Sequence, residues 1–228
     1  MSRHVVVRSN KKINPDILTG LAEAGSSTVH EADGRRGAID PALKPIQAGA
    51  RIAGSAVTVS CHPGDNLMIH AAVEQVRPGD IVVITTTSPS TDGMLGDLLA
   101  TSLRARGAIG VILDAGVRDV AELREMGFPV WSRAISTQGT VKASPGSVNV
   151  PIVVGGQVIN PGDAVIADDD GVVVVAHERA AEVLEAARKR TANEESKRER
   201  LAAGELGLDM YHLRPLLAEL GVVYVDEP

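Results

Sequence analysis

The sequence predicts an α/β protein built on a mostly parallel sheet. Residues 81–84 and 109–113 are near-continuous apolar runs, which are typical of strands buried on both faces. Between them, residues 95–106 carry leucines at helical spacing, and Gly107 ends that pattern. An alternation of strand, helix and strand implies parallel pairing through a crossover helix.

Further elements of this kind are expected on both sides of the central unit. Asn14-Pro15 opens a helix, because proline suits the first helical position. A second short helix carries His30 and Glu31. The pattern also predicts strands at 5–8 and 51–60 and helices at 66–76 and about 119–126.

The residue pattern changes in the second half of the chain and predicts a β-rich region. Glycine and proline turns separate short apolar runs at 129–134, 140–143, 151–154, 157–159, 164–167 and 172–175. Residues 178–203 then predict one long helix, followed by a helix at 211–220 and a strand at 222–225. We expect one domain at 1–176 and a helical arm at 177–228.

The second half of the long helix is polar nearly all round, over residues 189–200. Such a helix has no apolar face of its own to bury, so it must project, pack on a partner or fray. Two interpretations therefore remain open. The arm reaches a neighbouring subunit, or it is a solvated helix folded back on its own chain.

Composition excludes several classes of protein. A net charge of −6 and an aromatic content of 2% argue against a nucleic-acid surface, which needs basic stripes and stacking platforms. Cys61 is the one cysteine, so neither an internal disulfide nor a thiolate cluster can form. We expect no membrane span and no signal peptide, because the apolar runs are too short, and a cytoplasmic location follows.

Three places combine charged residues with loop or helix positions suited to chemistry. Asp97 follows a glycine-rich loop at a helix start, where free backbone donors can hold a carboxylate. Asp119 follows a buried strand, so it should lie at the sheet edge where ligands bind, with Arg118 as a planar donor. Glu194-Glu195 lies on the polar helix. Each feature alone is better explained by an ordinary helix start or a solvated face.

Other candidates carry weaker signals. Cys61 beside His62 lacks an identifiable third group, so a small buried cysteine is favoured over a nucleophile. The run from Asp168 to Gly171 lacks the later ligands of a calcium loop, and a tight turn explains it better. Lys142 is the one lysine to consider for a Schiff base, although an ordinary solvated lysine is expected. The histidines are expected to be structural: His30 and His177 lack ligand spacing, and His70 should lie in the core or an interface.

Taken together, several stretches resemble the 4-hydroxy-4-methyl-2-oxoglutarate/4-carboxy-4-hydroxy-2-oxoadipate aldolase family. The similarity extends from about residue 27 to residue 226. The stretches that carry it are 63–66, 91–93, 96–101, 104–108, 114–120, 132–136, 139–143, 192–195 and 207–211.

The resemblance implies a swivelling β/β/α fold and a homotrimer or homohexamer with sites between subunits. It also implies a divalent metal, Mg²⁺ or Mn²⁺, bound directly by Asp119. Arg118 would hold the substrate and its enolate, and Asp97 would order metal-bound water. The loop that begins at Gly96 would present the amides of Leu98 and Leu99 to the pyruvyl carboxylate. The resemblance also implies two acidic contributors, Glu194 from a neighbouring subunit and Glu31.

The activity that the resemblance implies is a retro-aldol cleavage, typical of aromatic-compound degradation. The products would be pyruvate plus oxaloacetate or a second pyruvate, with oxaloacetate decarboxylation as a side activity. Met94-Leu95 stands where bulkier aromatic residues are expected, which affects the fit around the distal end of the substrate.

Two alternatives remain at the sequence level. The sequence resembles, more distantly, the regulators that inhibit ribonuclease E by direct contact, which share the fold but lack the C-terminal arm. A Schiff-base aldolase using Lys142 is the other alternative.

Overall fold

The computed structural model of the chain describes residues 4–226. The chain divides into two compact units, Met1–Ala187 and Arg188–Pro228. Within the described residues, no helix combines the length and apolar character needed to cross a membrane.

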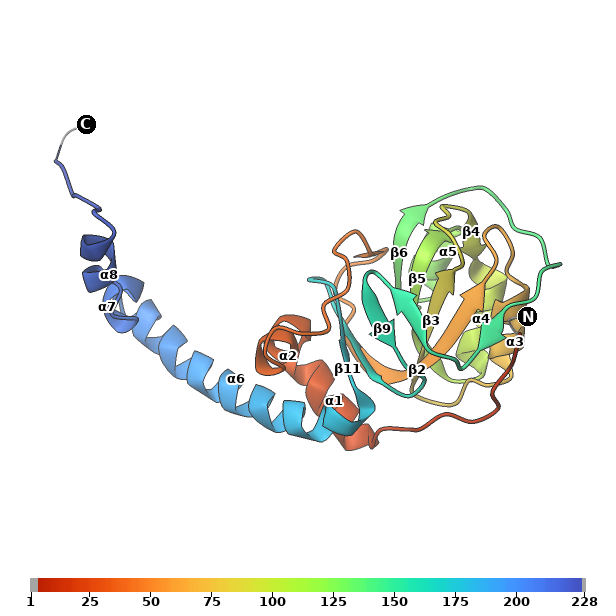
Figure 1. Cartoon of the computed structure of the whole chain (residues 1–228), viewed down its shortest axis with the longest axis horizontal. Coiled ribbons are helices and arrows are strands. Elements are labelled where there is room, and N and C mark those ends of the chain that lie inside the picture. Colours follow the sequence, from red (N-terminus) through yellow and green to blue (C-terminus); the bar gives the residue numbers. More distant parts are fainter. Residues whose placement is uncertain (1–3, 227–228) are drawn as a thin grey trace. The chain divides into compact units, whose positions relative to one another are not determined.

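The larger unit is built on a curled nine-stranded sheet, as far as the described residues extend (Figure 1). Its order is β1-β6-β5-β3-β2-β10-β11, with β4 paired to β5 and β7 paired to β2. The pairs β2–β3, β3–β5 and β5–β6 are parallel, which confirms the predicted crossovers. The strands are β1 Lys44–Pro45, β2 Ile52–Cys61, β3 Asp80–Thr86, β4 Gly93–Leu95, β5 Ala108–Val117, β6 Val130–Ile135, β7 Ser147–Val148, β10 Ala164–Ala167 and β11 Val172–Val175, with a separate hairpin of β8 Ile152–Val154 and β9 Gln157–Ile159.

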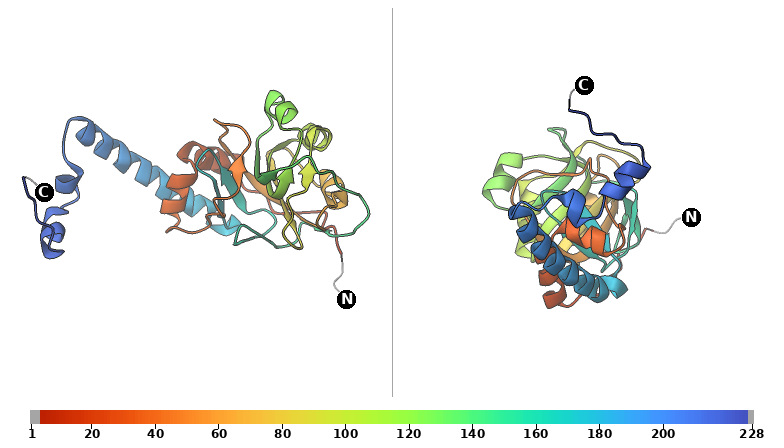
Figure 2. Two further views of the ribbon diagram at one scale, coloured as in Figure 1. Left: turned by 90° about the horizontal axis from the view of Figure 1, so that it is seen from above. Right: turned by 90° about the vertical axis from the view of Figure 1, so that its left-hand side faces the viewer.

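Helices lie between and beyond the strands. Asn14 caps the first helix by accepting a hydrogen bond from the Asp16 amide, and Pro15 is its first residue, as expected. The long helix is continuous over 23 residues (Figure 2). The helices are α1 Pro15–Ala24, α2 Ser26–Ala32, α3 Leu67–Val73, α4 Asp97–Ala105, α5 Val120–Glu125, α6 Ala180–Ala202, α7 Gly207–Met210 and α8 Arg214–Glu219.

The central strands are buried on both faces, and their side chains alternate between two cores. Val82 and Ile84 of β3 join the cluster that contains Leu99 and Leu103 of α4. Ile81 and Val83 point to the opposite cluster, which contains Val154 of the β8–β9 hairpin. Helices α3, α4 and α5 therefore cover one face of the sheet (Figure 1), and the hairpin lies on the other. Each fully buried Ile or Val contributes about 1.5–3 kcal/mol, so these strands fix the scaffold.

The first half of α6 packs on the larger unit. Ala180, Val183 and Leu184 join a third cluster with Leu21 of α1 and Ile166 of β10. The sequence placed the boundary at residue 176, whereas the compact units divide after Ala187, where the apolar positions of the helix end.

Several predicted elements are wrong. Residues 5–8 and 140–143 form no strand and contribute only isolated bridges, Val6 with Val148 and Val141 with Asp65. Residues 222–225 also form no strand. Leu95 ends strand β4, so the helix begins at Asp97, and the predicted helix at 211–220 spans only Arg214–Glu219. Short apolar runs become strands only where a neighbouring strand offers backbone partners, which local pattern does not show.

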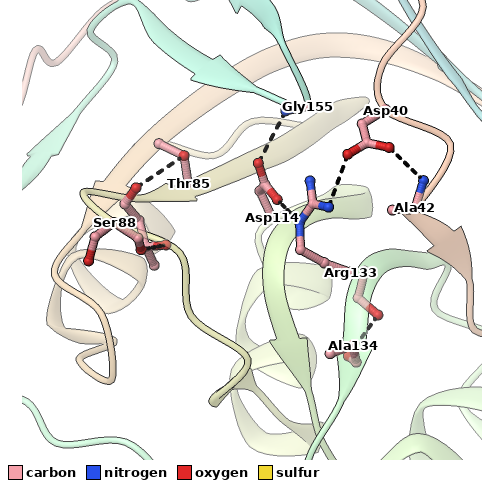
Figure 3. Close-up of polar contacts among 10 residues, drawn as sticks. Asp40, Ala42, Thr85, Ser88, Asp114, Arg133, Ala134 and Gly155 are labelled. Atoms are coloured by element: carbon pink, nitrogen blue, oxygen red, sulfur yellow. Dashed lines mark hydrogen bonds and ion pairs between the residues drawn. The ribbon is translucent and has the colours of Figure 1, made fainter.

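The Arg133 side chain ties three segments together on the hairpin face of the sheet (Figure 3). Its guanidinium donates to Asp114 of β5 and to Asp40 of the loop before β1. Asp114 also accepts a hydrogen bond from the Gly155 amide, in the turn of the β8–β9 hairpin. Because every carboxylate here is already paired, this cluster holds the scaffold rather than a ligand.

Asp65 ties the start of α3 to the loop that follows β6. Its side chain is 1% exposed and accepts hydrogen bonds from the amides of Leu67, Ala143 and Ser144. Burial opposes the charge of Asp65, but these three amides outweigh it and hold the pKa below its ordinary value.

Replacing Asp65 should destabilise the fold. We expect Asp65→Ala to lower the free energy of unfolding by about 2–4 kcal/mol, because three buried amides lose a charged acceptor. The depressed pKa means that the contribution of Asp65 is complete above about pH 4 and is lost as the pH falls further. Urea unfolding at pH 7 and pH 3 would measure the difference, which should shrink at pH 3. Glu125→Ala, an exposed change on α5, should shift stability by under about 0.5 kcal/mol; equal losses in both variants would contradict this role of Asp65.

Candidate active site

Two strand ends bring the predicted site residues together. Strand β4 pairs in parallel with the end of β5, through Gly93 with Gly116 and Leu95 with Val117. The residues that follow each strand therefore emerge side by side at the carboxyl edge of the sheet, where open α/β sheets bind ligands. A cavity of about 490 Å³ opens there. It is lined by Asn66, His70, Gly93, Gly96, Asp97, Leu98, Leu99, Ser102, Arg118, Asp119, Gly139, Thr140 and Lys142.

Asp119 occupies a backbone conformation that few residues other than glycine adopt. It is the residue before α5, with φ of 54° and ψ of 43°. Its Oδ2 accepts a hydrogen bond from the Asp97 amide at 3.2 Å, and its Oδ1 accepts one from Arg118 Nε at 3.2 Å. Strained conformations of this kind cost about 1–3 kcal/mol and concentrate at functional sites.

Gly96 leaves the space that the Asp119 carboxylate fills. A Cβ atom at Gly96 would lie 2.2 Å from Asp119 Oδ2 and 3.2 Å from Arg118 Cγ. The backbone of Gly96 is extended, so another residue could adopt it, and the requirement for glycine here is purely steric. The start of α4 and the Asp119 carboxylate are thus in such close contact that no side chain fits between them.

The first turn of α4 faces the same cavity. Gly96 at the N-cap has no side chain to cap this helix, and Asp119 accepts only the amide of Asp97, so the next amides have no partner within the helix. The amides of Leu98 and Leu99 belong to this turn, where the positive end of the helix dipole favours an anion. Leu99 is buried, whereas the Leu98 side chain is 80% exposed at the rim.

The donor set fits a hard divalent cation that keeps most of its water. Within residues 4–226, no group of three or more His, Cys, Asp or Glu side chains is placed to hold a metal ion. The Asp119 side chain is 27% exposed and reaches the cavity, with Asp97 beside it. Mg²⁺ commonly binds one or two carboxylates and completes its octahedron with water and substrate. The Asp119 carboxylate is therefore suited to bind such an ion.

Two predicted contributors lie outside this cavity lining. Glu31 is on α2 in an ion pair with Arg35, at 3.1 Å. Glu194 is on α6 in an ion pair with Arg190, at 2.7 Å, and belongs to the smaller unit. A contribution of either residue to the site of a neighbouring copy stays a prediction.

The sequence analysis did not place His70, Lys142 or Asn66 at the site. His70 is exposed rather than in the core, and Lys142 is exposed, as expected, and also lines the cavity. Asn66 lies one helical turn before His70 on α3, so both present the same face. The spacing of Asn66 and His70 was the available signal that they share a face. The proximity of this face to residues 139–142 is long-range and leaves no local pattern in the sequence.

The other candidates are structural, as expected. Cys61 is buried, and desolvation raises the pKa of its thiol to about 12, so it is inert. The ring nitrogens of His30 and His177 contact the carbonyls of Arg36 and Lys12. Asp168, in the turn between β10 and β11, accepts hydrogen bonds from Ser26 at the start of α2.

A larger cavity, about 880 Å³, lies at the opposite edge of the sheet, where β2, β3 and β5 begin. Its walls are mainly apolar, and its buried carboxylate, Asp80, already pairs with Lys12. Size favours this cavity, but the two carboxylates, the helix start and Arg118 favour the smaller one for chemistry.

Known proteins resemble this chain over most of its length. A protein of Halalkalibacterium halodurans is 30% identical over 169 residues, which is 74% of this chain and 80% of that protein. A Burkholderia multivorans protein is 36% identical over 138 residues, 60% of this chain and 84% of the relative. Both are named, provisionally, 4-hydroxy-4-methyl-2-oxoglutarate aldolases.

Solved structures and a family model agree with these relatives. RraAS2 of Streptomyces coelicolor, described as an unusual member of the RNase ES inhibitor RraA family, has a TM-score of 0.74 and 29% identity, covering 83% of this chain and all of that one. The RNA-processing inhibitor RraA of Thermus thermophilis has a TM-score of 0.60 and 27% identity, covering 65% of this chain and 90% of that one. The family model described as RraA-like (aldolase/RraA) matches residues 18–174. The chain therefore belongs to the RraA-like family of aldolases and RraA proteins.

Proposed function

We propose that this chain is a divalent-metal-dependent pyruvate aldolase. Its substrate is 4-hydroxy-4-methyl-2-oxoglutarate, 4-carboxy-4-hydroxy-2-oxoadipate or both. The observation that carries the proposal is the convergence of Asp119, Arg118 and the first turn of α4 on one cavity. The aldolase names of two relatives support a carbon–carbon lyase.

The chain's own groups can hold a 2-oxo acid in one orientation. The amides of Leu98 and Leu99 receive the carboxylate next to the 2-oxo group, because a helix start binds anions. Arg118 offers its planar fork to the same end of the substrate, since Nε alone is engaged by Asp119. Asp119 and Asp97 then lie beside the 2-oxo group.

Cleavage of the C3–C4 bond leaves its electron pair on the pyruvyl fragment as an enolate. A bound Mg²⁺ or Mn²⁺ would supply Lewis-acid stabilisation of the developing charge. Arg118 adds a fixed positive charge, and the α4 amides add aligned dipoles. A water that Asp97 orders takes the proton of the C4 hydroxyl as that carbon becomes a carbonyl. Protonation of the enolate at C3 yields pyruvate; oxaloacetate decarboxylation passes through the same enolate.

The proposal includes a homotrimer or homohexamer in which a neighbouring copy completes each site. Arg118, at the cavity, remains 45% exposed, and Ile135, which lines the adjoining hollow, is 63% exposed. A neighbouring copy that covered this rim would exclude water and could bring Glu194 or Glu31 to the substrate.

A non-catalytic regulator of ribonuclease activity is the second candidate. The likeness to the two RraA structures favours it, because the fold is shared. A regulator would need neither the Asp119 carboxylate nor the first turn of α4. Metal-dependent pyruvate release therefore separates the two functions.

Asp119 should be essential to turnover but not to folding. We expect the protein to release pyruvate from 4-hydroxy-4-methyl-2-oxoglutarate with Mg²⁺, to stop in EDTA, and to lose at least about 10³-fold in kcat as Asp119→Ala. A coupled lactate dehydrogenase assay measures pyruvate, and circular dichroism checks the fold. Asp16→Ala, a change at an exposed position on α1, is the matched control. Full turnover after chelation would end the metal proposal.

Gly96 should be required for the position of the Asp119 carboxylate. We expect Gly96→Ala to weaken Mn²⁺ binding by about tenfold or more, because the new methyl group displaces Asp119 Oδ2. Electron paramagnetic resonance of free Mn²⁺ measures this directly. Gly207→Ala introduces no close contact and should leave binding unchanged. Unaltered Mn²⁺ affinity in Gly96→Ala would show that Asp119 is not a ligand.

Arg118 should act through its planar fork as well as its charge. We expect Arg118→Lys to lower kcat/KM by about 10²-fold, because a point charge cannot hold both Asp119 and the substrate. Steady-state kinetics would measure the loss. The exposed Arg106→Lys should behave as the unaltered protein, and near-normal kcat/KM in Arg118→Lys would refute the role of the fork.

A further inference from the structure

The wall of the cavity formed by α3 and the loop after β6 is a built surface. Lys142 lies on the loop and His70 on the helix, and both line the cavity. Buried Asp65 accepts hydrogen bonds from backbone amides of both segments. Backbone hydrogen bonds also join Asn66 to Val141 and Val141 to Gly64. The backbones of the two segments are thus fixed to one another.

Resting on the function proposed above, we propose that Lys142, with His70 beside it, is the receptor for the distal carboxylate of a dicarboxylic 2-oxo acid. The ammonium group of Lys142 makes no hydrogen bond or ion pair with any residue that the structure describes. It is therefore a cation that faces a cavity with its donors unused, whereas Arg118 is partly engaged by Asp119.

Charge balance in the cavity supports a doubly charged substrate. Asp97 and Asp119 offset Arg118 and Lys142. Desolvation and the charge of Lys142 both lower the pKa of His70, so its ring is neutral near pH 7 and serves as a hydrogen-bonding group. With the proposed dication, the cavity carries a net charge of about +2. A dicarboxylate would neutralise this charge, whereas a monocarboxylate would not.

The chain between Gly139 and Lys142 is long enough to allow such a substrate between the two ends. A Cβ atom at Gly139 would lie 3.4 Å from Arg118 Nη1, so the loop passes close to the pyruvyl end. Lys142 is three residues further on, at most about 11 Å along an extended chain. The end carbons of a five-carbon diacid lie about 5 Å apart, given bonds of about 1.5 Å. The Lys142 side chain is long enough to close the difference.

Asn66 adds an acceptor on the same wall. Its Nδ2 donates to the Met94 carbonyl at 3.2 Å, which fixes the amide. Its buried Oδ1 has no hydrogen-bond partner among the described residues. Because an orphaned buried acceptor is costly, a hydroxyl or water between the two ends of the substrate is expected to satisfy it.

The test compares two non-cleavable probes that differ only at the distal end. 2-Oxoglutarate carries the second carboxylate, and 2-oxopentanoate does not. Isothermal titration with Mg²⁺ should show that the unaltered protein prefers 2-oxoglutarate by about tenfold. Lys142→Ala should lose that preference, and Lys142→Arg should keep most of it. Lys44→Ala, an exposed change on β1, is the matched control.

A second readout separates this role from the alternatives. Mg²⁺-dependent exchange of pyruvate methyl protons, followed by nuclear magnetic resonance, reports the pyruvyl end alone and should persist in Lys142→Ala. An unchanged preference for 2-oxoglutarate in Lys142→Ala would overturn the proposal. Loss of proton exchange in both Lys142→Ala and Lys142→Arg would also overturn it, because that result indicates a Schiff base at Lys142. Absence of exchange in the unaltered protein would instead defeat the proposed function, while the probe preference still tests Lys142.

Discussion

The close packing of the Asp119 carboxylate against Gly96 is the constraint on which the rest of the site depends. Asp119 must adopt a left-handed conformation for its carboxylate to reach the Asp97 amide, and it can do so only where position 96 has no Cβ. The strain is supported by strands β4 and β5, whose pairing fixes both residues. A carboxylate is thereby held at a helix start, beside the positive end of the helix dipole.

The scaffold could be predicted from the sequence because its signals are local. The apolar runs of β3 and β5 are buried on both faces, so they needed no alternation to be recognised. The sheet pattern also placed Asp119 at the carboxyl edge, after a buried strand. It did not place Asp97 beside it, because strand β4, which brings the start of α4 to the end of β5, is only three residues long and was expected to be part loop and part helix.

The opposite wall of the cavity could not be predicted in this way. Residues 140–143 resembled a short strand, but buried Asp65 holds the adjoining loop through side-chain hydrogen bonds to backbone amides. Such contacts join segments far apart in sequence and have no periodicity. His70 and Lys142 were therefore assigned ordinary roles, because the pattern around each shows only a helix and a loop.

The electrostatics of the site also bear on its assembly. Interactions between charges weaken strongly when water surrounds them, since effective dielectric constants near a surface are several times those of an interior. Arg118 is nearly half exposed in the single chain, and apolar Leu98 and Ile135 are exposed around it. An enolate would be poorly stabilised in so open a site. In the oligomer we propose, a neighbouring copy that covered this rim would bury Leu98 and Ile135 and exclude water, so one contact would serve both assembly and the proposed catalysis.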